Sequence, residues 1–184
     1  MPNGTNIAVP STLPWKSTFN YPELAACGEG VLLELQGLPK LPRGHMLVFD
    51  RIDEAQPSGG KYELGFIQAS FRLSPGLWFF HDHFKDDPIM PGCLGIDALW
   101  QLAGFFLVLH GAKGKGRAIG SGEIKFGEEI LPEHRVVTYR VDVKRLVRGS
   151  DKRPWFVVAD GHVDRDGVIA YLATDLKVGV FPKQ

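Results

Sequence analysis

The sequence predicts an α+β fold in which an antiparallel sheet wraps around one long buried helix. The segment 93–110 is apolar at nearly every position, and repeated strand patterns follow it. A helix without a polar face is buried on all sides, and strands joined by short turns pair antiparallel. The 184 residues are 44% hydrophobic and 23% charged, as expected for one ordinary globular domain.

The first half of the chain predicts an arm, a short helix and a hairpin. Residues 1–19 lack the basic region and apolar core of a signal peptide, so we expect a flexible N-terminal arm followed by a single domain over 20–184. Asn20 is suited to cap a helix that reaches Cys27 and ends at the next glycines. Strand patterns follow over 31–35, 46–52 and 62–73, the last two joined into a hairpin by a turn at 57–60.

The second half begins with an irregular segment and continues with the buried helix and long strands. Residues 76–91 are rich in aromatic side chains, histidine and proline, which makes this loop a candidate site. A membrane span is the alternative for 93–110, but Asp97 and Gln101 interrupt the run, leaving far fewer than the ~20 apolar residues required. Strand patterns then occupy 118–126, 136–147, 155–163 and 168–181.

The charge balance argues against a general nucleic-acid binder, because 21 basic residues meet 21 acidic ones. Residues 1–92 have 7 Lys and Arg against 10 Asp and Glu, a net charge of −3, so 93–184 has a net charge of +3. Seven basic residues against two acidic ones gather in 135–153, which fits either a solvated strand face or a surface for an acidic partner. Cys27 and Cys93 form no CxxC pair, so we expect a reducing compartment, the cytoplasm.

His83 and Asp97 are the candidate proton-transfer groups. Asp97 lies about one turn into an otherwise apolar helix, where loss of hydration favours the protonated acid that can donate a proton. Gln101 is four residues later on the same helical face, so its amide can orient the Asp97 carboxyl. His83 precedes the helix and can act as a base near neutral pH.

The start of the buried helix is a candidate oxyanion site. A proline and Gly92 precede the helical run, which leaves free backbone N–H groups at the positive end of the helix dipole with no side chain to block a ligand. A carbonyl or thioester oxygen could be stabilised there as an enolate forms. A base, an acid and an oxyanion site together predict proton abstraction next to a carbonyl.

Other interpretations of these residues remain open. Asp97 could simply cap the helix or pair with a buried arginine, and Cys93 could be a nucleophile with His83 as its base. His81 and His83 could bind a metal ion, although no third ligand stands at a recognisable spacing. The run 114–120 only superficially resembles a dinucleotide-binding loop, since it follows a helix rather than a strand.

Three sequence blocks resemble the bacterial 3-hydroxydecanoyl-acyl carrier protein dehydratase/isomerase family, the FabA type. The central block runs from Trp78-Phe-Phe through His83-Phe-x-x-Asp-Pro-x-Met-Pro-Gly-Cys-Leu-Gly-x-Asp97-Ala-x-Trp-Gln-Leu, and Gly114-Lys-Gly-Arg-Ala and Asp175-Leu-Lys-Val-Gly-x-Phe181 follow it. The similarity covers roughly residues 20 to 181. The resemblance implies a hot-dog fold and a homodimer with two active sites at its interface.

The resemblance also implies a role for each matching residue. His83 removes the proton next to the thioester, and Asp97, from the other subunit, protonates the departing 3-hydroxyl. The Gly92 N–H holds the thioester oxygen and the Ile89 carbonyl orients the imidazole. Asp97 and the Pro-Gly-Cys-Leu-Gly run favour the bifunctional type, because the related FabZ type, which only dehydrates, has Glu at this position.

The expected activity is therefore dehydration of (3R)-3-hydroxyacyl thioesters on acyl carrier protein, with isomerisation of the trans-2 to the cis-3 product, in fatty acid biosynthesis. We expect no metal, no cofactor, no nucleic acid and no membrane among its partners. The acidic carrier should dock near Arg145, Arg148 or Lys177. A hot-dog thioesterase and a non-catalytic acyl-binding subunit are the alternatives. The sequence departs from the family where His81-Asp82 replaces the usual Gly-Cys.

Overall fold

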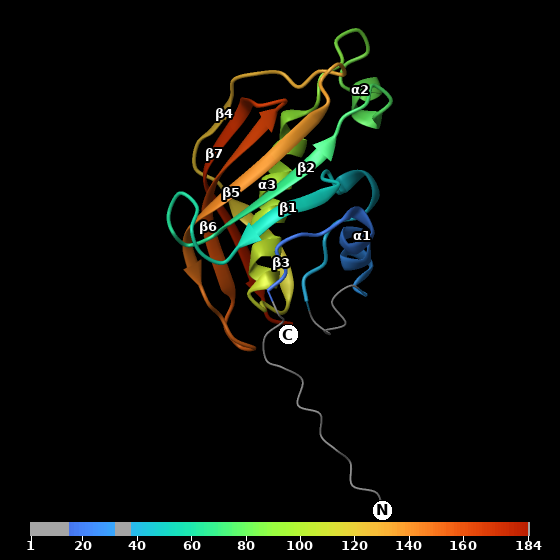
Figure 1. Cartoon of the computed structure of the whole chain (residues 1–184). Coiled ribbons are helices and arrows are strands. Elements are labelled where there is room, and N and C mark those ends of the chain that lie inside the picture. The colour runs from blue at the N-terminus through green and yellow to red at the C-terminus, as the bar shows by residue number, and fades with distance from the viewer. Residues whose placement is uncertain (1–14, 32–37, 184) are drawn as a thin grey trace, which may run out of the picture.

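One curved antiparallel sheet of seven strands wraps around the long helix α3 in the computed structural model, which describes residues 15–31 and 38–183 (Figure 1). The predicted α+β fold is confirmed, and the arrangement is that of a hot-dog fold. The strands are β1 (Arg51–Gln56), β2 (Phe66–Arg72), β3 (Lys115–Gly120), β4 (Ile124–Phe126), β5 (Val136–Val147), β6 (Trp155–Arg165) and β7 (Val168–Phe181).

The strand order places the last three long strands in the middle of the sheet. It runs β1-β2-β5-β6-β7-β3, with β4 paired to another part of β7, and every pairing is antiparallel. The two edges of the main path are therefore β1 and β3. A single residue, Phe19, bridges to Ile52 of β1, so the chain before α1 partly covers one of these edges.

Helix α3 (Gly92–Leu109) forms the core of the fold, as predicted. It is long and apolar enough to cross a membrane, but 67% of its residues are buried against the sheet, which is the behaviour of a core helix. The expectation of burial on every side is wrong. Asp97, Trp100, Gln101 and Gly104 are only partly covered and follow a helical spacing, so one stripe of α3 is open.

Several element boundaries differ from those predicted. The strand expected over 46–52 is preceded by a 3₁₀ turn, η1 (Gly44–Met46), and β1 begins only at Arg51. The single strand expected over 118–126 is two strands, β3 and β4, which pair with different ends of β7. The strand expected over 31–35 lies almost wholly outside the described residues.

Two short helices flank the sheet. Helix α1 (Tyr21–Glu29) begins with a capping box, in which Asn20 Oδ1 accepts from Glu23 N and the Glu23 carboxylate accepts from Asn20 N. Helix α2 (Trp78–Asp82) occupies the start of the segment expected to be irregular. Residues 15–19 of the predicted arm pack on the domain, where the Trp15 indole donates to the Ala55 carbonyl.

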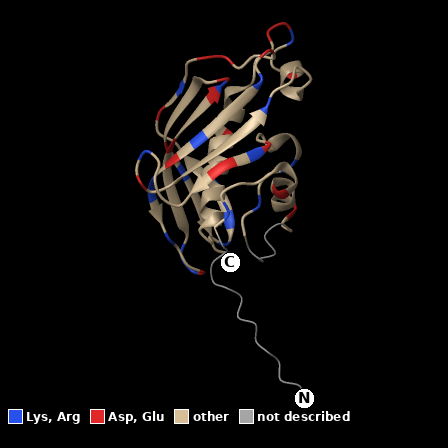
Figure 2. Cartoon of the chain, viewed as in Figure 1, with Lys and Arg blue, Asp and Glu red and all other residues tan. Residues whose placement is uncertain are grey.

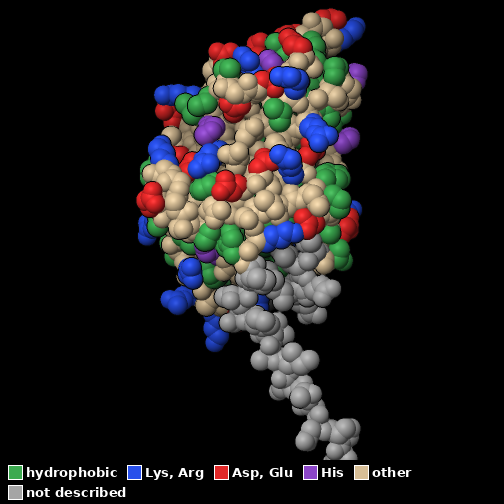
Figure 3. All heavy atoms as spheres, viewed as in Figure 1, with side chains coloured by type: hydrophobic (Ala, Val, Ile, Leu, Met, Phe, Trp, Pro, Cys, Tyr) green, Lys and Arg blue, Asp and Glu red, His purple; other side chains and the backbone are tan. Residues whose placement is uncertain are grey.

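The outer surface of the sheet combines charges of both signs (Figures 2 and 3). Lys144 Nζ lies 2.6 Å from an Asp175 carboxylate oxygen and 3.2 Å from one of Asp160, which also accepts a hydrogen bond from the Tyr62 hydroxyl. These paired charges occupy strands β5, β6 and β7 and account for part of the basic excess in 135–153.

Replacing Tyr139 by Phe should stabilise the domain. Tyr139 is fully buried on β5, and its hydroxyl has no hydrogen-bond partner within the described part of the chain. Burial also raises its pKa well above the ordinary value, so the hydroxyl stays neutral. Because Phe removes an unsatisfied buried polar group, the free energy of unfolding should rise by about 1 kcal/mol. Urea unfolding at fixed protein concentration measures this, and a loss of stability would mean that the hydroxyl has a partner.

Candidate active site

The candidate base His83 lies at the end of α2, where a tight loop fixes its ring. The His83 N–H donates to the Phe79 carbonyl, and the His83 carbonyl accepts from the Ile89 N–H. Nδ1 of the imidazole is 3.1 Å from the Ile89 carbonyl oxygen. A carbonyl can only accept, so Nδ1 bears the proton in this hydrogen bond and Nε2 of the neutral ring is left as the basic nitrogen. The ring also stacks on Phe84 with centroids 3.9 Å apart.

Gly92 is the first residue of α3, so its backbone N–H has no acceptor within the helix. A side chain at this position would collide with β4, because an added Cβ would lie 2.5 Å from the Phe126 ring. One turn later, an added Cβ at Gly95 would lie 2.9 Å from the Tyr171 ring. Two glycines therefore allow aromatic side chains of β4 and β7 to pack against the first turn of α3.

Tyr171 and Phe126 are neighbours of the site that the sequence interpretation missed. Their ring centroids are 4.9 Å apart, and the Tyr171 hydroxyl donates to the Met90 carbonyl at 3.5 Å. Burial raises the pKa of Tyr171 to about 12, so its hydroxyl remains a donor at neutral pH. Pairing of β4 with β7 brings these rings to Gly92 and Gly95 in the first turn of α3, and no local sequence pattern near the helix indicates that pairing.

The candidate acid Asp97 is held by Gln101, as the spacing of four residues predicts. The Gln101 amide nitrogen lies 2.6 Å from Asp97 Oδ2 and 2.7 Å from the Met46 carbonyl of η1. Both amide hydrogens are thus used, and the carboxyl is fixed between α3 and the 3₁₀ turn. The buried Gln101 Oε1 has no partner among the residues that the structure describes.

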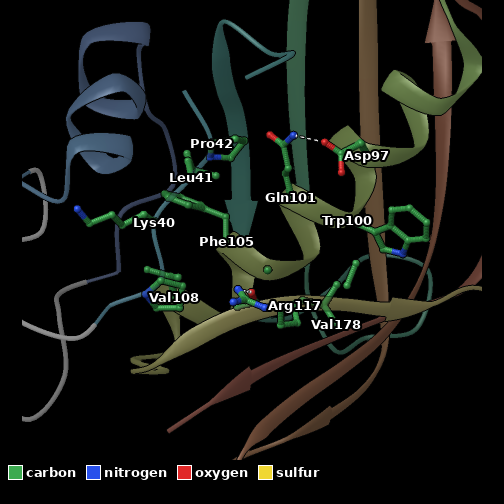
Figure 4. A pocket seen from close by; sticks show the side chains of 14 residues that line it. Lys40, Leu41, Pro42, Asp97, Trp100, Gln101, Phe105, Val108, Arg117 and Val178 are labelled. Atoms are coloured by element: carbon green, nitrogen blue, oxygen red, sulfur yellow. Dashed lines mark hydrogen bonds between the residues drawn. The ribbon is translucent and has the colours of Figure 1, made fainter. Parts of the chain in front are cut away.

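Asp97 and Gln101 line a pocket between the open stripe of α3, strand β3 and the segment before η1 (Figure 4). The cavity has a volume of about 160 Å³. Apolar side chains form most of its walls, and the charged ones besides Asp97 are Lys40 and Arg117. The lining also includes Leu41, Pro42, Trp100, Gly104, Phe105, Val108, Ala118 and Val178.

His83 does not line this pocket, so one chain does not bring the candidate base and acid together there. His83 lies with Ile89 before the helix, whereas Asp97 opens onto the pocket farther along it. Cys93 is exposed at the first turn of α3, while Cys27 is buried. His81 and Asp82 are also exposed, at the end of α2.

Two alternative interpretations receive no support from the geometry. Within residues 15–31 and 38–183, His81 and His83 belong to no group of three side chains that could hold a metal ion. The run 114–120 forms edge strand β3 and does not lead into a helix, as a dinucleotide-binding loop would.

Two of the three residues expected to meet an acidic partner share one row of the sheet. Arg145 pairs with Val158, which pairs with Lys177 on β7, and both basic side chains are exposed. Lys177 in turn faces Gly120 of β3, so this row reaches the strand that lines the pocket. Arg148 is exposed one residue beyond the end of β5.

Comparison with known proteins gives one family and several similar folds. A family model described as a FabA-like domain matches residues 41–174. The dehydratase heterocomplex ApeI:P from Xenorhabdus doucetiae is similar with a TM-score of 0.53 and 13% identity, over 77% of this chain and 87% of that one. A hypothetical thioesterase with coenzyme A from Streptococcus pneumoniae TIGR4 has a TM-score of 0.50 and 12% identity, over 72% and 86%. At these identities the solved structures support the fold alone.

Proposed function

This chain belongs to the FabA-like domain family, and on that premise we propose that it dehydrates (3R)-3-hydroxyacyl thioesters held on acyl carrier protein. The trans-2-enoyl product of a medium-length chain is then isomerised to the cis-3 form. The observation that carries the proposal is the His83–Ile89 hydrogen bond, which leaves Nε2 of a neutral imidazole as a base beside the start of α3. The Asp97 carboxyl, held by Gln101, supplies the acid.

The proposed dehydration needs one proton acceptor, one proton donor and one oxyanion site. His83 Nε2 takes the proton from C2, and the thioester oxygen accepts from the Gly92 N–H as negative charge develops on it. The C3–O bond breaks, Asp97 gives its proton to the departing hydroxyl, and water leaves. For isomerisation, a proton is removed from C4 and another is returned to C2, so the double bond moves and no atom is lost.

A second copy of the chain would complete the proposed site. The pocket beside Asp97, at about 160 Å³, is smaller than the ~300–1,000 Å³ typical of ligand sites. It also lacks the proposed base, since His83 is not among its lining residues. A homodimer that places His83 of one copy opposite Asp97 of the other supplies both the missing group and the missing walls.

Thioester hydrolysis is the second candidate, because Asp97 is a carboxylate on a pocket wall and could activate water. The fold is shared with the hypothetical thioesterase above. A non-catalytic acyl-binding subunit is the third candidate. Neither the thioesterase nor the acyl-binding subunit assigns a role to His83 or to its hydrogen bond with the Ile89 carbonyl. Dehydration does, and we therefore favour it.

Incubation with 3-hydroxydecanoyl thioester separates the candidates. Dehydration yields an enoyl thioester with no free thiol, and resolving the product geometry shows whether the cis-3 isomer forms. Thiol release without an enoyl product would refute the proposal in favour of a thioesterase. An unchanged substrate would favour the acyl-binding subunit.

A further inference from the structure

The 3₁₀ turn η1 sets the orientation of the Gln101 amide. A glutamine amide can rotate by half a turn, which exchanges its donor and acceptor ends. A carbonyl oxygen can only accept, so the Met46 carbonyl, 2.7 Å away, selects the orientation in which Nε2 faces it. The same nitrogen donates to Asp97 Oδ2 at 2.6 Å (Figure 4). The donor that Asp97 receives therefore depends on the position of a backbone carbonyl in η1.

The orientation of this amide decides which oxygen of Asp97 bears the acid proton. While Gln101 Nε2 donates to Oδ2, that oxygen is an acceptor, so a proton on the carboxyl lies on Oδ1. With the amide reversed, Gln101 Oε1 would face Oδ2 and would accept a hydrogen bond from a proton held there. That proton would point at Gln101 and away from a substrate. A reversed amide would thus disable the proposed acid without removing it.

The turn that carries the Met46 carbonyl lies at the surface. Two backbone hydrogen bonds close it, from Met46 N to the Arg43 carbonyl at 3.3 Å and from Leu47 N to the Gly44 carbonyl at 3.1 Å. Gly44 has a φ of +57°, and the side chains of His45 and Met46 are exposed. An exposed turn of three residues needs contact with a neighbouring element to keep its carbonyl in one place.

The His45 ring makes that contact with helix α2. It stacks on the Trp78 indole, with ring centroids 5.3 Å apart and planes inclined by 12°. Trp78 is partly buried and packs edge-on against buried Phe79, whose carbonyl accepts from the His83 N–H. Helix α2 is therefore anchored in the core. The contact joins two ring faces, so another flat aromatic ring could replace the imidazole.

We propose that His45 is a positioning residue for the acid. By stacking on Trp78 it holds the Met46 carbonyl where that carbonyl orients Gln101, and Gln101 in turn keeps the proton of Asp97 on Oδ1. This inference rests on the proposed function, because that function makes Asp97 a proton donor. His45 does not line the pocket beside Asp97, so it acts only through the turn.

The test observes the Gln101 amide by nuclear magnetic resonance and then measures the reaction. In the isotope-labelled full-length protein, its side-chain N–H signals are assigned by their loss in Gln101→Met. They should be protected from hydrogen exchange, because both hydrogens are bonded. His45→Ala should speed this exchange about tenfold and lower kcat about tenfold, with little change in KM. His45→Phe keeps the stack and is the matched control, so it should retain the protection and the kcat.

A Gln101→Met background separates positioning from a general weakening of the fold. His45→Ala should cost no further kcat there, because the group through which it acts is already absent. An equal loss of kcat in both backgrounds would overturn the inference, and so would unchanged exchange of the Gln101 amide in His45→Ala. Failure of the proposed function shows separately, as absence of enoyl product from the wild-type protein, while the amide exchange still decides whether His45 orients Gln101.

Mixed dimers test whether His45 acts on the Asp97 of its own chain. When His83→Ala chains pair with Asp97→Asn chains, the complete site takes Asp97 from the first chain and His83 from the second. His45→Ala should lower the activity about tenfold when it is added to the His83→Ala chain, and should have little effect on the Asp97→Asn chain. An equal loss in both placements would contradict an action through Asp97.

Discussion

Mixing inactive His83→Ala chains with inactive Asp97→Asn chains should restore activity. Each variant alone should lose about 10²- to 10⁴-fold in kcat, because each removes one proton-transfer group from every site. In a mixed dimer, one site combines both defects and the other has neither. After random exchange at equal concentrations, about a quarter of the sites should be intact. Rates of enoyl formation before and after co-refolding measure this.

A double variant, His83→Ala/Asp97→Asn, is the matched control for this experiment. Mixed with wild type, it forms heterodimers in which each of the two sites lacks one group. In an equal mixture, about a quarter of all the sites should be intact if each site is shared between two chains. About half of all the sites should be intact if each chain has its own site. No recovery in the first mixture together with half the activity in the second would show that the site lies within one chain.

The central helix and two of the long strands could be predicted closely from the sequence, because burial dictates their composition. The run 93–110 is apolar almost throughout, and the structure has α3 over Gly92–Leu109. The strands predicted over 136–147 and 168–181 coincide with β5 and β7, which lie within the sheet. In a buried element nearly every residue must be apolar or small, so the sequence pattern extends over the whole element.

The sequence predictions are wrong where the local residue pattern does not show how strands pair or which helix face is covered. Residues 118–126 appear continuous as a strand, yet the chain leaves one part of β7 after Gly120 and rejoins another at Ile124. The partly covered stripe of α3 was also not predicted, because Trp100 has an apolar side chain and Gly104 has none. Only the surrounding pocket shows that this face is open.

In the candidate site, too, contacts between residues close in sequence could be predicted, and contacts between distant segments could not. The Asp97–Gln101 hydrogen bond follows from helical spacing and could be predicted, as could the position of Gly92 at the start of α3. The contact of Gln101 with the Met46 carbonyl joins residues 55 positions apart, and no local pattern indicates it. The same holds for Phe126, which reaches Gly92 only through the pairing of β4.

Truncation of Phe106 should produce the largest loss of stability among the substitutions considered. Phe106 is fully buried on α3, and its ring centroid lies 5.9 Å from that of Trp15 and 4.5 Å from that of His110. Across the core it also contacts the turn before β2, where an added Cβ at Gly65 would lie 2.7 Å from the Phe106 ring. Phe106→Ala should lower the free energy of unfolding by about 3–5 kcal/mol.

The size of this effect follows from how little the surroundings of Phe106 can move to fill the cavity. Gly65 has a φ of +100° and an added Cβ would lie 2.5 Å from the Gln56 carbonyl oxygen, so the turn is already closely packed. Urea unfolding at one fixed protein concentration measures the loss, with Phe106→Leu as the control: it removes fewer buried atoms and should cost clearly less than the Ala variant. Because Phe106 does not line the pocket, the folded Ala variant should keep its kcat/KM. A loss below 1 kcal/mol for Ala would mean that the Trp15 segment collapses into the space.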